Sequence, residues 1–176
     1  MTAPVIRGVN HIGITVPDIE VAKSFLVEAF GGQVIYQSFG PHDPPRQGPE
    51  FERATGAFPG TVVCAQAMVK IGTGPDIELF EMHGTNQAQP VRASDFGITH
   101  FGIYTDDIEA SVDRFAKAGG AVLTAPRAIP YATEKGSGNK VCYCRMPWGT
   151  TIEFITTPDR MAYQDQTDLR RWQDEG

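Results

Sequence analysis

The sequence predicts an α+β fold in which one unit, made of a strand, a helix and three further strands, is used twice. The first observation is a self-match between segment 9–20, VNHIGITVPDIE, and segment 98–109, ITHFGIYTDDIE. The second is that a Gly-Gly pair follows each of these segments. The third is that the two units end on similar strands, IELF and IEFI. Each copy therefore carries a histidine near its start and a glutamate near its end.

The first module opens on a strand over residues 9–16, because aliphatic residues alternate with His11 and leave that histidine on the opposite face. Asp18 is suited to cap a helix over residues 19–30, which carries one apolar stripe at helical spacing. Gly31 ends this helix, since glycine readily adopts the left-handed conformation. The remaining expected strands start at residue 34 and cover residues 61–70 and 77–83.

Residues 38–60 have no counterpart in the second module and contain five prolines and four glycines. They predict a long loop, which in a compact domain is usually a lid, a binding loop or a mobile segment. Together with a second loop at 125–139, this segment is expected to close over a site.

The second module follows a polar linker at 84–96 and repeats the order of the first. Its expected strands cover 97–105, 121–124, 140–146 and 150–157, and its expected helix covers 107–117. Two such sheets, with their helices outside, would leave a concave surface between them. In the tail, Met161, Leu169 and Trp172 stand near helical spacing. They predict an amphipathic helix that docks either on its own chain or on a second subunit.

Bulk composition excludes several classes of function. The net charge of −6 argues against a nucleic-acid partner, which requires a basic face. No apolar run is long enough to span a bilayer and no secretory signal opens the chain, so no membrane partner is expected. The odd set of Cys64, Cys142 and Cys144 predicts a reducing, cytoplasmic location. The spacing of Cys142 and Cys144 is too tight for a usual zinc motif, so we expect buried thiols on one face of a strand.

Four residues of ligand type occupy equivalent positions in the two modules: His11, Glu78, His100 and Glu153. If a pseudo-twofold axis relates the modules, two imidazoles and two carboxylates converge on that axis. Such a set suits one divalent Zn, Ni, Co, Mn or Fe ion and leaves room for water or substrate. A single histidine or glutamate on a strand is more often structural or solvent-facing, but the matched pattern favours a metal site.

Other polar residues carry less information about function. Asp18 and Asp107 also match between the modules, and we interpret both as helix caps. His42 and His83 have no counterparts, and we interpret them as surface or loop residues.

These motifs resemble the vicinal oxygen chelate superfamily, which includes glyoxalase I, methylmalonyl-CoA epimerase, extradiol dioxygenases and the bleomycin- and fosfomycin-resistance proteins. The resemblance rests on the segments VNHIGI, IELFE, ITHFGI and PWGTTIEF. It implies a single domain over residues 5–158, with modules at about 5–88 and 95–158 and a tail at 159–176. The implied fold is two paired βαβββ modules that form an incomplete barrel around a concave metal site.

The resemblance also implies roles for the four matched residues. A ligand set of His11, Glu78, His100 and Glu153 looks like glyoxalase I. Methylmalonyl-CoA epimerases carry Gln or Glu at the second position, so they also remain possible. Extradiol dioxygenases use only the equivalents of His11, His100 and Glu153.

We therefore expect a metal-dependent lyase or isomerase of the glyoxalase I or epimerase type. The metal would stabilise an enolate or enediolate of a small oxygenated substrate, with Glu78 or Glu153 as the base. One alternative is an Fe(II) ring-cleaving dioxygenase of the extradiol type, and a second is a small-molecule binding or resistance protein without turnover. A homodimer is expected. The candidate substrate-pocket residues, for several of which packing is the simpler interpretation, are Phe80, Tyr104, Arg53, Tyr131, Tyr143 and Trp148.

Overall fold

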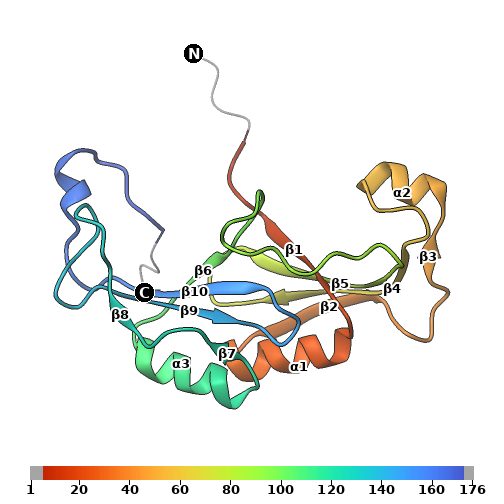
Figure 1. Ribbon diagram of the computed structural model, residues 1–176, viewed down its shortest axis with the longest axis horizontal. Coiled ribbons are helices and arrows are strands. Elements are labelled where there is room, and N and C mark those ends of the chain that lie inside the picture. The colour runs from red at the N-terminus through yellow and green to blue at the C-terminus, as the bar shows by residue number, and fades with distance from the viewer. Residues whose placement is uncertain (1–5, 173–176) are drawn as a thin grey trace. The chain divides into compact units, whose positions relative to one another are not determined.

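The computed structural model describes residues 6–172. Internal contacts divide the chain into two compact units, residues 1–88 and 89–176, and each unit is described by itself (Figure 1). The predicted domain limits of 5 and 158 remain a prediction. Among the described helices, none combines the length and the apolar character needed to cross a lipid bilayer.

The first unit is a five-stranded open sheet with one long helix and one short helix (Figure 1). Its sheet has the order β1-β5-β4-β2, with β3 paired to β4. The strand β1 runs parallel to β5, and the other pairs are antiparallel. The elements are β1 (His11–Val16), α1 (Ile19–Phe30), β2 (Gln33–Phe39), β3 (Arg46–Gln47), α2 (Pro49–Thr55), β4 (Val62–Lys70) and β5 (Asp76–His83).

The second unit repeats this topology. Its sheet has the order β6-β10-β9-β7, with β8 paired to β9, and β6 runs parallel to β10. The predicted α+β class and the repeated strand–helix–strand–strand–strand unit are therefore confirmed. The elements are β6 (Phe101–Tyr104), α3 (Ile108–Lys117), β7 (Ala121–Val122), β8 (Arg127–Ala128), β9 (Lys140–Arg145), β10 (Thr151–Thr156) and the 3₁₀ turn η1 (Ala162–Asp165).

The helix α1 has the predicted bounds because its ends are specified locally. The Asp18 side chain accepts hydrogen bonds from the amides of Glu20 and Val21, and Gly31 ends the helix at a φ of 68°. The apolar stripe packs on β4 and β5. Its buried residues are Ile19, Ala22, Phe25, Leu26 and Ala29.

The helix α3 follows the same plan in the second unit. The Asp107 side chain accepts from the amide of Ala110, and the fully buried ring of Phe115 meets Phe154 of β10 edge-on at 5.5 Å. A methyl group on Gly120 would overlap the Phe115 ring. The second glycine of this Gly-Gly pair is therefore required by close packing.

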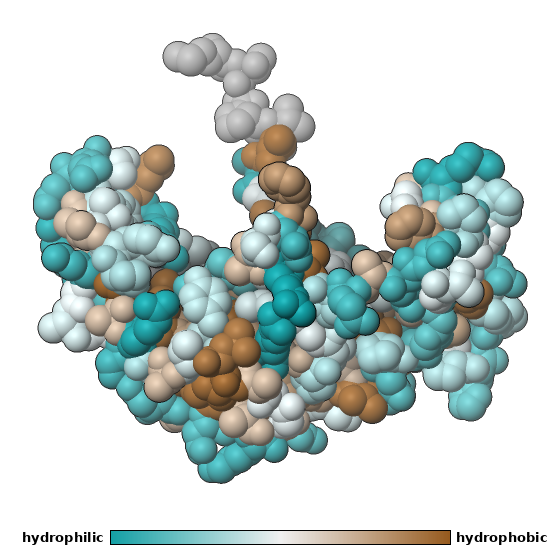
Figure 2. Space-filling model, in the orientation of Figure 1, coloured by the Kyte–Doolittle hydropathy of each residue, from teal (hydrophilic) through white to brown (hydrophobic). Residues whose placement is uncertain are grey.

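The prediction of a continuous loop over residues 38–60 is wrong, because this segment contains β3 and α2. The helix α2 has Pro49 in its first turn, acidic residues beside it, and Gly56 at its end with a φ of 74°. None of its residues is buried, so it lacks the apolar stripe on which the sequence analysis depended. Figure 2 agrees, with mainly hydrophilic and pale colours over α2.

Two further predictions need correction. The strand expected at 97–105 is shorter, since β6 begins at Phe101 and His100 lies just before it. Over residues 159–172, the part of the tail that the structure describes, there is one 3₁₀ turn, η1, in place of the expected amphipathic helix. Met161 is buried within its own chain, whereas Leu169 and Trp172 are exposed. Polar contacts to the loop before β9 hold the start of the tail, because the Asp159 carboxylate accepts from Ser137 and from the amide of Gly138.

Candidate metal centre

In the first unit, the parallel pairing of β1 and β5 brings His11 to Glu78. Gly13 is the register partner of Glu78, two residues beyond His11 on the same face of β1. The Nε2 atom of His11 lies 3.2 Å from Oε2 of Glu78. The other carboxylate oxygen, Oε1, accepts a hydrogen bond of 2.9 Å from the side-chain amide of Gln66 on β4. One oxygen of Glu78 is thus held by the sheet, and the other faces the imidazole.

The neighbour of His11 determines which ring nitrogen is available. Nδ1 of His11 lies 2.8 Å from Oδ1 of Asn10, and an amide oxygen can only accept, so Nδ1 donates. A neutral His11 ring then turns the lone pair of Nε2 towards the Glu78 carboxylate. That contact is repulsive unless a proton or a cation lies between the two atoms. The pair therefore has the form of two metal ligands oriented by a second contact.

The second unit contains an equivalent pair. The Nε2 atom of His100 lies 3.9 Å from Oε2 of Glu153 on β10. The Nδ1 atom of His100 has the Thr99 hydroxyl at 3.0 Å, at the position that matches Asn10. In both units, then, Nδ1 of the histidine has a neighbouring polar partner and Nε2 faces a carboxylate.

Tyr143 on β9 completes this second pair. It stands opposite Glu153 in the antiparallel register, and its ring meets the His100 ring edge-on at 5.1 Å. Burial, together with a hydrogen bond to the Glu153 carboxylate, raises the pKa of Tyr143 to about 12. The phenol therefore stays protonated at neutral pH and donates to Glu153.

Each half thus brings its own predicted histidine and glutamate together, and the use of all four residues for one ion stays a prediction. Imidazole nitrogen and carboxylate oxygen are suited to Zn, Ni, Co, Mn and Fe in the divalent state. The donor types and the oriented rings therefore fit a divalent cation.

The six substrate-pocket candidates lie in different environments. Tyr143 is adjacent to His100, and Phe80 lies on β5 with its ring reaching towards Gly13. Tyr104 packs against the buried cluster of Ile129, Val141 and Ile155. The other three lie outside the strands: Arg53 is exposed on α2, Tyr131 is exposed in the loop before β9, and Trp148 is partly buried in the turn after β9.

The sequence analysis missed several residues that hold the candidate ligands. Asn10 and Thr99 precede the histidines at matched positions, so the repeat itself carried a signal for them. Gln66 carried none, because only the register of β4 against β5 places it beside Glu78.

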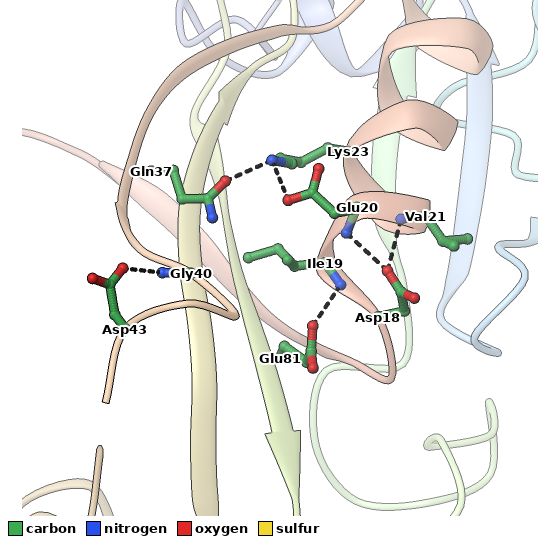
Figure 3. Close-up of polar contacts among 9 residues, drawn as sticks. All are labelled: Asp18, Ile19, Glu20, Val21, Lys23, Gln37, Gly40, Asp43 and Glu81. Carbon is green, nitrogen blue, oxygen red and sulfur yellow. Dashed lines mark hydrogen bonds and ion pairs between the residues drawn. The ribbon is translucent and has the colours of Figure 1, made fainter. Parts of the chain in front are cut away.

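Glu81 was also missed, and it performs a different task. Its Oε2 atom accepts a hydrogen bond of 3.0 Å from the amide of Ile19, in the first turn of α1. Figure 3 shows the Glu81 carboxylate turned towards this amide, beside the Asp18 cap. A second carboxylate therefore helps to satisfy the free amides at this helix start.

The thiols of the second unit behave as predicted. Cys142 and Cys144 are fully buried, and their sulfur atoms lie 3.6 Å apart. Burial raises the pKa of Cys144 to about 12. Both are therefore poor nucleophiles, which agrees with a packing role.

Comparison with known proteins identifies the family. The family model described as the Glyoxalase/Bleomycin resistance protein/Dioxygenase superfamily matches residues 10–157. The chain belongs to this superfamily. The resemblance inferred from the sequence motifs is thereby confirmed. Proteins of the glyoxalase superfamily generally bind a divalent metal ion and act on or bind small molecules.

Several members of the superfamily are similar along most of their length. A 2-epi-5-epi-valiolone epimerase from Actinomyces sp. is 30% identical over 180 residues, which cover 96% of this chain and 89% of that protein. A glyoxalase family protein from Bacillus cereus has a TM-score of 0.64 at 20% identity, over 89% of this chain and 97% of that one. A glyoxalase/bleomycin resistance protein/dioxygenase domain from Frankia sp. has a TM-score of 0.61 at 17% identity, over 91% and 98% of the two chains. The two structures establish the shared fold.

Proposed function

We propose that this protein is a divalent-metal-dependent epimerase that inverts a carbon atom next to a carbonyl group. The observation that carries the proposal is the repeated pair, in which a histidine Nε2 faces a glutamate carboxylate in each unit. The epimerase relative aligns over nearly the whole chain, and it supports isomerase-type chemistry. Membership of the glyoxalase superfamily supports the proposal that this protein is an enzyme.

The proposed ligands are His11, Glu78, His100 and Glu153. The prediction that these four side chains serve one ion is part of the proposal. When bound, the cation supplies Lewis acidity that favours an enolate over the neutral ketone. Asn10 and Thr99 orient the two rings through Nδ1, which keeps each Nε2 directed towards the glutamate of its own unit.

The proposed proton-transfer groups are the carboxylates of Glu78 and Glu153. One carboxylate removes the proton from the carbon next to the carbonyl, and the C–H electron pair moves to form the enolate. The other group starts the cycle as a carboxylic acid and gives its proton to the opposite face of that carbon, which inverts the carbon. Proton exchange with solvent then restores both groups, so the reaction has no net change in atoms or electrons. The Gln66 side chain and the Tyr143 hydroxyl each donate a hydrogen bond to one of these carboxyl groups, which fixes its orientation.

The proposed substrate class is an α-hydroxy ketone. Such a compound has two neighbouring oxygens for a cation and an acidic C–H bond beside the carbonyl. The relative is named for a ketone, valiolone, and for its epimerisation. We therefore propose 2-epi-5-epi-valiolone as the first compound to test, followed by simpler α-hydroxy ketones and glyoxalase-type substrates.

The decisive experiment is exchange of the substrate C–H for deuterium from solvent, followed by NMR on protein purified without chelators. We expect exchange that is lost with chelator and restored by a divalent ion. Glu78→Gln and Glu153→Gln should each slow exchange by about 100-fold or more. Glu50→Gln, on the exposed helix α2, is the matched control. Full exchange in both variants, with the metal retained, would refute the assignment of the base.

Metal identification separates this proposal from the two alternatives. Bound iron together with oxygen uptake on a catechol would favour the ring-cleaving dioxygenase. Saturable ligand binding without metal and without exchange would favour a binding or resistance protein. The homodimer expected from the sequence is also a proposal, which sedimentation velocity tests directly.

A further inference from the structure

Three side chains of different chemical kinds meet where β4 and β5 pair near the end of β5. The ligand atoms of Cys64, Glu81 and His83 all lie within 4.8 Å of one another. Glu81 and His83 are two residues apart on β5, so their side chains leave the same face of the strand. Cys64 joins them because the pairing with β5 shifts between Val63 and Ala65. The extra residue in this bulge is Cys64, and a bulge of this kind redirects a side chain.

The carboxylate of Glu81 is held in place before any ion binds. Its Oε2 accepts from the backbone amide of Ile19 at 3.0 Å (Figure 3). Its Oε1 lies 3.1 Å from Nε2 of His83. One oxygen is therefore committed to the start of α1, while the other faces the imidazole. Contacts of this kind orient the ligands of known metal sites and raise their affinity.

The donor types determine the class of ion that this cluster fits. Zinc is bound in proteins by thiolate, imidazole and carboxylate ligands, which are the three types present here. Mg²⁺ and Ca²⁺ prefer oxygen ligands, so a site with a thiolate does not suit them. Three protein ligands leave one tetrahedral position for water. The side chain of His83 is 52% exposed while that of Glu81 is 16% exposed, so an ion can enter from the solvent side.

We propose that Cys64, Glu81 and His83 form a second metal site, which binds zinc or a similar thiophilic divalent cation. The site is separate from the His11–Glu78 pair because Glu78 and Glu81 point to opposite faces of β5. The contacts agree, since Glu78 meets β1 whereas Glu81 meets α1. A cation here ties β4 to β5 and, through Glu81, to the first turn of α1. It therefore stabilises the first unit, and the inference does not rest on the proposed function.

Cobalt(II) titration of the metal-free full-length protein tests this site. A cobalt–thiolate bond gives an intense near-ultraviolet charge-transfer band, and the His–Glu pairs contain no sulfur. We expect a saturable band in the native protein and in His11→Ala. The band should disappear in Cys64→Ser, and cobalt affinity should fall by at least about tenfold in His83→Asn. The matched control is Cys142→Ser, which removes a thiol of the second unit and should keep the band.

The second site would be overturned if the native protein showed no band or if the band persisted in Cys64→Ser. Because His83 is exposed, His83→Asn should fold even if Cys64→Ser does not, and unchanged cobalt affinity in it would also count against the site. The His11→Ala variant keeps the two proposals apart. If the cobalt band survives in His11→Ala while the native protein shows no deuterium exchange, the second site is supported and the proposed epimerase is refuted.

Discussion

The Nε2 atom of His11 on β1 lies 3.2 Å from a carboxylate oxygen of Glu78 on the parallel strand β5. These residues are far apart in the sequence, and they meet because the last strand of the unit pairs with the first. The same pairing of β6 with β10 brings His100 towards Glu153. The parallel pair of strands is thus the element that forms each half of the candidate metal centre.

The polar neighbours of the histidines should control metal affinity. Asn10→Ala and Thr99→Ala each remove the group beside Nδ1, so the ring loses its preferred orientation. We expect each change to weaken metal binding by about 10- to 100-fold without unfolding the protein. A competition titration against a chromophoric chelator measures this effect. Asn86→Ala in the exposed linker is the control, and equal affinities in all three variants would contradict the orienting role.

Tyr143 should make folding stability depend on alkaline pH. Its pKa rises from 10.0 to about 12, chiefly through burial and then through the hydrogen bond to Glu153. The folded state therefore holds the phenol proton more tightly than the unfolded state does. The resulting stabilisation is fully present below pH 10 and is lost as the pH rises towards about 12.

Urea unfolding over a pH series, compared with Tyr143→Phe, measures this dependence. The native protein should lose free energy of unfolding relative to Tyr143→Phe between pH 10 and about 12. Tyr131→Phe, which changes an exposed tyrosine, should follow the native curve. A constant difference between the native protein and Tyr143→Phe across this window would show that the phenol does not titrate as described.

Gly120→Ala should destabilise the second unit. The added methyl group would overlap the ring of Phe115, which is fully buried against β10 and cannot move aside freely. Overpacking of this kind costs about 1–3 kcal/mol of unfolding free energy. Thermal or urea unfolding measures the change. Gly74→Ala, at a turn where a methyl group meets no atom, is the control, and equal stability of the two variants would exclude the packing explanation.

The parts of the fold that local chemistry specifies were predictable. Helix α1 was predicted with its observed bounds because Asp18, the apolar stripe and Gly31 are all local signals. The short helix α2 was missed although it has local caps, because it buries none of its residues and so shows no apolar periodicity. The tail shows the converse failure, since residues near helical spacing did not form a helix.

The sequence by itself determined the repeat, the α+β class and the matched positions of one histidine–glutamate pair in each half. A duplicated unit must bury the same faces twice, so its residues recur at matched positions. Only the tertiary structure decided which side chains surround these pairs. The register of β4 on β5 places Gln66 beside Glu78, and a bulge turns Cys64 towards Glu81. Register and bulges depend on pairing between strands distant in sequence, and no local pattern specifies that pairing.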